Sequence, residues 1–266
     1  MTVETGAQGT VLRLTDITKR FGALTANDAV SFHLDRGEVV ALLGEHGAGT
    51  TTLMNILFGQ YTADEGSVEL FGHPLPPGNS RAALDAGVGM VHQHFTLADN
   101  LSVLDNIVLG TQSLWRMRAD RAAARAKIEQ LAQDFGLAVV ADAKVGTLSV
   151  GERQRVEILK ALYRDARILI LDEPTAVLTP QETDALFVTL REMVARGLSV
   201  IFISHKLHEV MAIANRVVVL RHGKVVGAVE TAVTDRHKLA ELMVGAEVKP
   251  PVVRASKPGP ALMRLN

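Results

Sequence analysis

The sequence has 266 residues, contains no cysteine and is only 4% aromatic. A chain without cysteine has neither a disulfide framework nor a thiolate metal site, and this composition fits a reducing compartment. The sequence also has no large excess of charge of one sign, because 28 basic and 29 acidic residues leave a formal net charge of -1. No overall positive field therefore favours nucleic acid as a partner.

Long hydrophobic runs are absent as well. No stretch of the sequence approaches the roughly 18 apolar residues that a membrane-spanning helix needs. The first ten residues, MTVETGAQGT, lack the basic and then apolar pattern of a signal peptide. With 47% hydrophobic residues the chain is nevertheless long enough to bury a substantial core. We therefore expect a soluble, cytosolic protein.

The most informative stretch is Leu148–Leu171, LSVGERQRVEILKALYRDARILIL, which runs directly into Asp172 and Glu173. A turn of small residues opens a segment with apolar residues at helical spacing, and the four apolar residues 168–171 predict a fully buried parallel strand. Carboxylates at the carboxyl end of such a strand lie where open α/β sheets bind their ligands. This pattern predicts a nucleotide-binding protein.

A second stretch has the order strand, glycine-rich loop, helix, with the strand at 38–43 and the helix at 53–58. Backbone N–H groups of such a loop and the start of its helix form a cradle for phosphate. Gly44 and Gly49 fit the pattern G-x-x-x-x-G-K-[ST], but Thr50 stands at the lysine position. Taken alone, a loop without this lysine is more typical of an ordinary glycine-rich turn. The candidate phosphate-binding residues are Gly44, Gly47, Gly49, Thr50, Thr51 and Thr52.

Elements on either side of these stretches complete the expected domain. Strands at 11–14 and 29–33, with Thr18–Gly22 as a turn between them, predict an antiparallel subdomain at the start. Further strands are expected at 66–70 and 89–91, the second followed by His92-Gln93-His94. A metal site at these two histidines is disfavoured, because no carboxylate stands at ligand spacing. Helices are expected at 101–109 and 116–135.

The last third of the chain adds a helix up to about residue 195 and a buried strand at 200–203 that ends at Ser204-His205. A histidine just past a strand lies at the same sheet edge as Asp172 and Gly44. A hairpin at 217–229 and a helix at 237–243 close the domain. The proline-rich segment from 246 predicts a linker, and residues 261–265 predict the start of a new strand.

In this order, the motifs resemble those of the nucleotide-binding cassette of the ABC transporter family, over about Val11 to Val248. The resemblance implies an α/β fold of the P-loop NTPase class, with a mainly parallel core sheet, an N-terminal antiparallel β subdomain and an α-helical subdomain. The cassette would span residues 1–245, with its core at about 1–92 and 161–245 and its helical subdomain at about 93–160. Residues 246–266 would be a linker and the start of a possible second cassette.

The resemblance also implies roles for single residues. Phe21 would stack on adenine, Gln93 would sense the γ-phosphate and contact Mg²⁺, and Asp172 would hold Mg²⁺. Glu173 would be the catalytic glutamate and His205 the switch histidine. The implied ligands are ATP and Mg²⁺, to which the hydroxyl of Thr51 would also contribute.

Residues 148–154 resemble the LSGGQ signature of this family, with Val150 in place of a glycine and Glu152 in place of the glutamine. In this family the signature of one cassette closes the nucleotide site of another. The resemblance therefore implies a second cassette as a partner, to whose nucleotide Ser149, Gly151 and Glu152 would be presented. It also implies transmembrane permease subunits and, indirectly, a substrate-binding protein, with this chain at the cytoplasmic face of the membrane.

Segments such as VGMVHQHFTLADNLSVLDNIVLG and DEPTAVLTPQE are similar to those of importers of simple sugars and nucleosides, in which two cassettes are usually fused. The chain thus resembles the first half of a tandem protein that couples ATP hydrolysis to uptake. Thr50 leaves an alternative open, in which a degenerate, non-hydrolysing half only supplies its signature to a partner. A soluble ABC ATPase acting on DNA or ribosomes fits less well, since the segment between Gln93 and Leu148 is too short for a long coiled coil.

Overall fold

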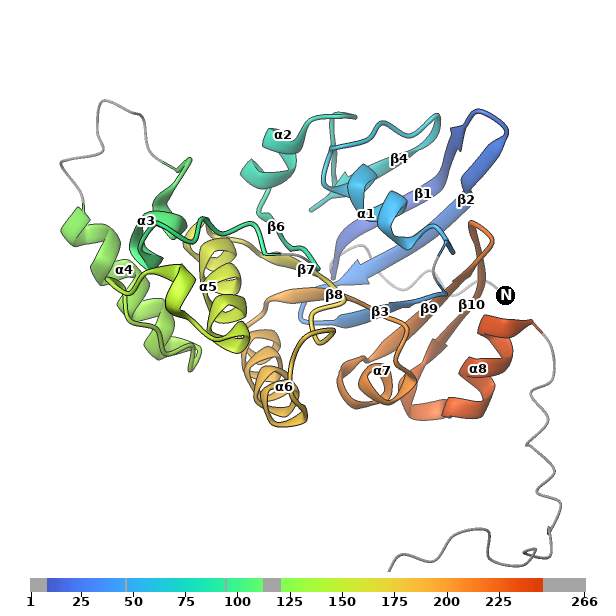
Figure 1. Cartoon of the computed structure of the whole chain (residues 1–266). Helices are drawn as coiled ribbons and strands as arrows, with labels where there is room; N and C mark the ends of the chain where they lie inside the picture. The colour runs from blue at the N-terminus through green and yellow to red at the C-terminus, as the bar shows by residue number, and fades with distance from the viewer. Residues whose placement is uncertain (1–8, 46, 94, 112–120, 246–266) are drawn as a thin grey trace, which may run out of the picture.

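The computed structural model describes residues 9–45, 47–93, 95–111 and 121–245, and these residues form two sheets with helices around them (Figure 1). The smaller sheet is antiparallel and has the order β2-β1-β4-β5. Its strands are β1 (Thr10–Phe21), β2 (Leu24–Asp35), β4 (Glu65–Leu70) and β5 (His73–Pro74). The expected antiparallel subdomain is therefore present at the start of the chain.

The larger sheet has six strands in the order β10-β9-β3-β8-β7-β6. Five neighbouring strands are parallel, and only β10 runs antiparallel, to β9. Strand β3 is buried along its whole length, as a strand covered on both faces must be. The strands are β3 (Val39–Leu43), β6 (Val88–Val91), β7 (Ile168–Asp172), β8 (Ser199–Ser204), β9 (Arg216–Arg221) and β10 (Lys224–Glu230).

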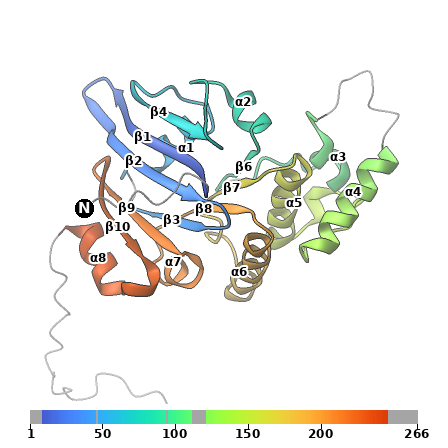
Figure 2. The ribbon, with the colours of Figure 1, turned by 180° about the vertical axis from the view of Figure 1, so that it is seen from behind.

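Alternate residues of this sheet belong to two cores, one on each face. Along β3, Val39, Ala41 and Leu43 pack with α5, α6 and α7, whereas Val40 and Leu42 pack with α1 and the antiparallel sheet. Figures 1 and 2 show this layering from both sides. The helices are α1 (Thr50–Leu57), α2 (Ser80–Asp85), α3 (Val103–Val108), α4 (Arg121–Asp134), α5 (Val150–Tyr163), α6 (Pro180–Ala195), α7 (Leu207–Ile213) and α8 (Arg236–Val244).

Several expected boundaries need correction. The expected turn at residues 18–22 belongs largely to β1, which runs to Phe21 because it pairs with β2 as far as Leu24. The helix after the glycine loop begins at Thr50, three residues earlier than expected. Helices α2 and α7 and the short strand β5 were not expected from the sequence. The first residues of the helix expected at 116–135, the histidines at 46 and 94, and the expected linker and strand after 245 lie outside the described residues.

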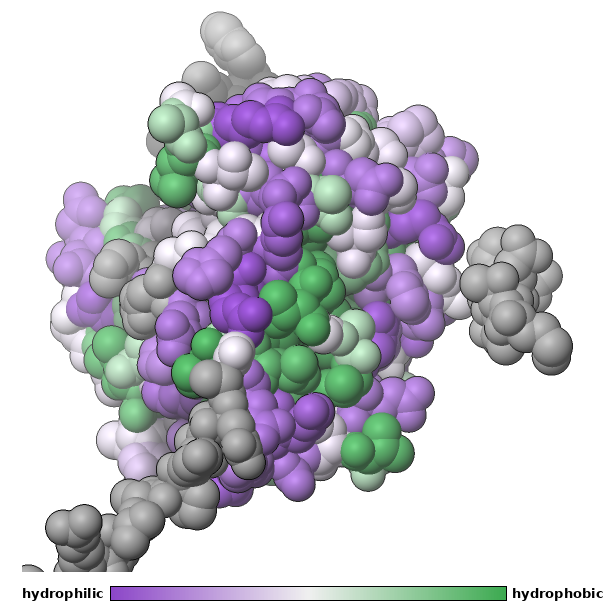
Figure 3. Space-filling view, turned by 90° about the vertical axis from the view of Figure 1, so that its right-hand side faces the viewer, coloured by the Kyte–Doolittle hydropathy of each residue, from purple (hydrophilic) through white to green (hydrophobic). Residues whose placement is uncertain are grey.

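The side of the molecule that carries β10 and α8 has an apolar area amid polar residues (Figure 3). Strand β10 is an edge strand of the larger sheet and contributes the partly buried Val225, Val226 and Val229. Within the part of the chain that the structure describes, no helix has the length and hydrophobicity needed to cross a membrane.

Candidate nucleotide site

Four polar segments meet at one edge of the larger sheet, because they follow the carboxyl ends of adjacent parallel strands. The glycine loop follows β3, His205 follows β8, Asp172 ends β7, and Gln93 lies just beyond β6. The strand order β3-β8-β7-β6 places these segments side by side. This arrangement brings together the residues that the sequence placed at the sheet edge.

The glycine loop opens α1 without a side-chain cap. Its N-cap is Gly49, with φ of +99°, and no side chain accepts the free N–H groups of the first turn. A Cβ at Gly49 would lie 2.3 Å from the carbonyl oxygen of Ala26, and one at Gly44 would lie 2.9 Å from that of Leu220. Only glycine tolerates the positive φ at position 49 and the close backbone contacts at positions 44 and 49. The N–H groups at the start of α1 thus remain available to an anion.

Asn27 of β2 anchors the glycine loop through a hydrogen bond. Its side chain is completely buried, and Nδ2 donates a 3.1 Å hydrogen bond to the carbonyl oxygen of Gly49. The antiparallel sheet is thereby joined to the start of α1. A buried amide with such a partner is a structural brace for the loop rather than a ligand.

Thr50 occupies the first position of α1, and its methyl carbon Cγ2 lies 3.5 Å from where a Cβ on Gly44 would be. The side chain thus leans back against the start of the loop. Thr50 brings no positive charge to the loop, whereas a lysine would. Among the described residues, the loop and the first turn of α1 offer backbone N–H groups and threonine hydroxyls to an anion.

Asp172 and Glu173 form an adjacent acidic pair. Partial burial, together with the negative charge of Glu173, raises the pKa of Asp172, and His92 opposes this change. Two neighbouring carboxylates that repel one another at the edge of a buried strand favour a cation between them and a phosphate.

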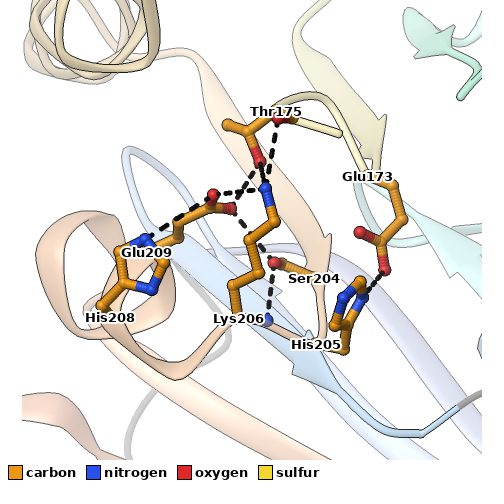
Figure 4. A network of polar contacts seen from close by, with 7 residues as sticks. All are labelled: Glu173, Thr175, Ser204, His205, Lys206, His208 and Glu209. Atoms are coloured by element: carbon orange, nitrogen blue, oxygen red, sulfur yellow. Dashed lines mark hydrogen bonds and ion pairs between the residues drawn. The ribbon is translucent and has the colours of Figure 1, made fainter. Parts of the chain in front are cut away.

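Glu173 is held in an unusual conformation. Its φ is +48°, which is unfavourable for a residue with a Cβ, and its N–H donates to the carbonyl oxygen of Ile203 over 3.1 Å. Its Oε1 lies 2.7 Å from Nδ1 of His205 (Figure 4). Oε2 is buried and has no hydrogen-bond partner among the described residues. A carboxylate with one anchored and one free oxygen is suited to accept a hydrogen bond from a bound molecule.

Phe21 lies at the tip of the β1–β2 hairpin and is 45% exposed. Tyr61 packs edge-on against its ring at a centroid separation of 5.7 Å, and Lys19 Nζ lies 5.4 Å from the ring centroid. Since Ala26 and Asn27 of the same hairpin contact Gly49, the hairpin lies next to the glycine loop. The sequence did not single out Tyr61, because a lone tyrosine carries no motif.

The signature segment begins α5 with a reciprocal capping box. Ser149 Oγ accepts from the N–H of Glu152, and the carboxylate of Glu152 accepts from the N–H of Ser149. The second capping box, Thr179 with Glu182, begins α6 in the same way. Glu182 also accepts a hydrogen bond from the N–H of Gly151, so the two helix starts touch.

These contacts place the signature away from the glycine loop of the same chain. Helix α5 packs in the core on one face of the larger sheet, and α1 packs in the core on the other face. Figure 2 shows α5 and α1 on separate sides of β7. Ser149, Gly151 and Glu152 therefore do not join the cluster around Glu173.

Comparison with known proteins identifies the family. The family model described as ABC transporter matches residues 27–176. The nucleoside import ATP-binding protein NupA of Lactococcus lactis is 47% identical over 91% of this chain and 48% of its own length. The ribose import ATP-binding protein RbsA 1 of Burkholderia thailandensis is 46% identical over 92% of this chain and 50% of its own. The chain spans about half the length of the curated relatives it matches.

Solved structures give the same result for the fold. The ADP conformation of MJ1267, an ATP-binding cassette of an ABC transporter, superposes with a TM-score of 0.78 at 26% identity, covering 89% of this chain and 99% of the other. A nucleotide-free ATP-binding cassette superposes with a TM-score of 0.77 at 25% identity, covering 88% and 98%. The expected fold class is confirmed. The motifs, the fold and the relatives together show that this chain belongs to the ABC transporter family.

Proposed function

We propose that the chain is the ATP-binding cassette of an importer and couples ATP binding and hydrolysis to uptake of a simple sugar or nucleoside. The observation that carries this proposal is the meeting of the glycine loop, Gln93, the Asp172–Glu173 pair and His205 at one sheet edge. The relatives are named as import ATP-binding proteins for nucleosides, ribose and glucose, which supports both the activity and the substrate class.

In this proposal the protein acts on ATP by positioning and electrostatics, as phosphoryl transfer requires. The N–H groups of the loop and the hydroxyls of Thr51 and Thr52 bind the phosphates. The free Oε2 of Glu173 orients and polarises the attacking water, while Oε1 stays anchored to His205. Gln93 and His205 face the γ-phosphate. Phe21, with Tyr61 beside it, offers a ring for the base.

The residues present also fit Mg²⁺. Asp172 supplies a carboxylate whose ionised form is disfavoured by burial and by Glu173, and a cation relieves that repulsion. Oxygen ligands of this kind are those that Mg²⁺ prefers, and the hydroxyl of Thr51 and the amide of Gln93 are further candidates. When bound, Mg²⁺ would neutralise charge on the phosphates.

The separation of the glycine loop and the signature on opposite faces of the sheet supports a two-cassette assembly. Each nucleotide would lie between the loop of one cassette and Ser149, Gly151 and Glu152 of a second. That second cassette is either another chain or, since the relatives are twice as long, a further part of the same protein. Transmembrane permease subunits and a substrate-binding protein complete the proposed importer, with the cassette at the cytoplasmic face of the membrane.

The names of these relatives give no support to the alternative of a non-hydrolysing half that only supplies its signature. Thr50 remains a difference that affects the rate. Losing a positive donor to the transition state lowers catalysis by about 10²–10³-fold. We therefore expect slow hydrolysis at this loop rather than none.

The experiment that tests the proposal is MgATP hydrolysis by the chain assembled with its permease subunits, compared with the Glu173→Gln variant. The glutamine keeps the shape of the side chain and its contact with His205 but removes the negative charge. We expect phosphate release that depends on Mg²⁺ and falls at least about 10²-fold in the variant. Equal phosphate release by both proteins would exclude Glu173 as the catalytic carboxylate.

A further inference from the structure

A second glutamate, Glu209 of α7, lies close to the proposed catalytic pair and is 2% exposed (Figure 4). Its Oε2 accepts hydrogen bonds from Thr175 Oγ1 over 2.6 Å and from Ser204 Oγ over 3.2 Å. Its Oε1 pairs with Lys206 Nζ at 3.0 Å. The buried carboxylate thus has a cation and two hydroxyl donors, which is what a buried charge requires.

The partners of Glu209 come from two different segments. Thr175 follows the end of β7, whereas Ser204 is the last residue of β8 and Lys206 follows it. Lys206 Nζ strengthens the link, because it also donates to the carbonyl oxygen of Thr175 over 3.2 Å. Thr175 and Ser204 are each only 1% exposed, so water cannot replace these bonds. The network thus joins the ends of β7 and β8.

Glu173 and His205 belong to the two backbone segments that this network joins. Glu173 is two residues before Thr175, and His205 stands between Ser204 and Lys206. The 2.7 Å contact between the two side chains depends on the relative placement of exactly these two backbone segments. Glu173 in addition keeps a left-handed φ of +48°, which the surrounding structure has to enforce.

We propose that Glu209 is a positioning residue for the ATPase site, and that it acts through Thr175 and Lys206 to hold Glu173 and His205 in register. The inference rests on the proposed function. Glu209 bonds to Thr175, Ser204 and Lys206, which lie within two residues of Glu173 or His205 along the chain. Glu209 acts on the segment that carries Glu173 through the hydroxyl of Thr175. Removing this hydroxyl therefore tests the positioning role of Glu209.

The test compares Thr175→Val with Thr175→Ser. Valine has the shape of threonine without the hydroxyl, and serine keeps the hydroxyl without the methyl group. Both are measured in the chain assembled with its permease subunits, as it stands and with Thr50→Lys. We expect the turnover number for MgATP to fall about tenfold with valine and to stay within about twofold with serine, with KM unchanged, since a hydrogen bond to a charged group is lost only with valine.

A matched control is Glu38→Gln. Glu38 pairs with Arg216 at 2.9 Å and stands just before β3, at the opposite end of the sheet. This variant should lower the melting temperature without changing turnover. The proposal is overturned if valine and serine behave alike, if the loss appears in KM, or if Glu38→Gln lowers turnover as much as Thr175→Val.

A second readout separates this inference from the proposed function. The ring signal of His205 is followed by NMR in chain labelled at histidine and assigned by its loss in His205→Gln. We expect Thr175→Val to shift the signal and Thr175→Ser and Glu38→Gln to leave it in place. If MgATP is hydrolysed neither with Thr50 nor with Thr50→Lys, the proposed function fails. The His205 signal then decides by itself whether Glu209 has the positioning role. An unmoved signal in Thr175→Val refutes the positioning role.

Discussion

Nδ1 of His205 lies 2.7 Å from Oε1 of Glu173, although the two residues are 32 positions apart in the chain. The parallel pairing of β7 with β8, in which Asp172 is opposite Ile203, creates this contact. One oxygen of Glu173 is therefore fixed, and the other is free within a buried site. In the proposed function, Glu173 is a general base and His205 is the partner that orients it.

Replacing His205 by alanine should therefore lower hydrolysis more than it lowers nucleotide binding. The imidazole orients Glu173, and removing an orienting or proton-transferring group typically costs about 10²–10⁴-fold in rate. Phosphate release and the MgATP dissociation constant are measured on the same preparation. His73→Ala is a suitable control, because His73 is exposed in the short strand β5 of the smaller sheet. A loss of binding equal to the loss of rate would argue against this role.

The glycine loop yields a prediction from two substitutions of the same kind. Gly49→Ala places a Cβ 2.3 Å from the carbonyl oxygen of Ala26, whereas a Cβ at Gly47 has no neighbouring atom within 4 Å among the described residues. Both positions have positive φ, so each alanine carries a strain of about 1–2 kcal/mol. Only Gly49→Ala should also displace the start of α1 and abolish nucleotide binding. Calorimetric binding curves that are alike for both variants would contradict this account of the cradle.

Two similar capping boxes allow the role of Ser149 to be isolated. Ser149→Ala and Thr179→Ala each remove one cap, which costs typically about 1 kcal/mol of stability. Only Ser149 belongs to the segment that would meet the nucleotide of a second cassette. We expect similar losses of melting temperature but a loss of hydrolysis in the assembled transporter only for Ser149→Ala. Comparable ATPase activity in the two variants would show that the signature hydroxyl has no functional part.

The same box predicts a pH dependence. Hydrogen bonds from the N–H and hydroxyl of Ser149 lower the pKa of Glu152 in the folded chain. A lowered folded pKa contributes stability above the ordinary value of about 4.3 and loses it as the pH falls through the folded value. Thermal unfolding of Glu152→Gln should therefore differ from that of the parent at neutral pH and converge with it in acid. A difference independent of pH would exclude this electrostatic contribution.

The sequence was sufficient for the strands of the larger sheet, because Ile168–Leu171 and its neighbours are short, wholly apolar runs bounded by polar turns. It also placed Gly44, Asp172 and His205 at one edge, since each lies at the end of a buried strand, whereas Gln93 was identified only through the family resemblance. The extent of β1 could not be predicted, because its pairing with β2 continues through polar residues such as Lys19 and Arg20.

The supporting residues of the site could not be predicted at all. Asn27 and Glu209 are polar residues that become significant only through contacts with distant parts of the chain, Gly49 in one case and Thr175 in the other. Nothing in their local sequence distinguishes them from exposed polar residues. The same holds for Tyr61, which the fold brings next to Phe21 although the two residues are far apart in the sequence. Motifs thus located the candidate ligand-binding groups, and the fold was needed to show which residues support them.

The central claim is that the loop between β3 and α1 binds MgATP although Thr50 has replaced a lysine. The most direct test is a calorimetric titration of MgATP into the chain, with Thr50→Lys alongside. We predict saturable binding by the chain as it stands, tightened about tenfold or more by the lysine, because a charge-assisted hydrogen bond contributes about 1.5–3 kcal/mol. Absence of saturable binding in both proteins would contradict the account.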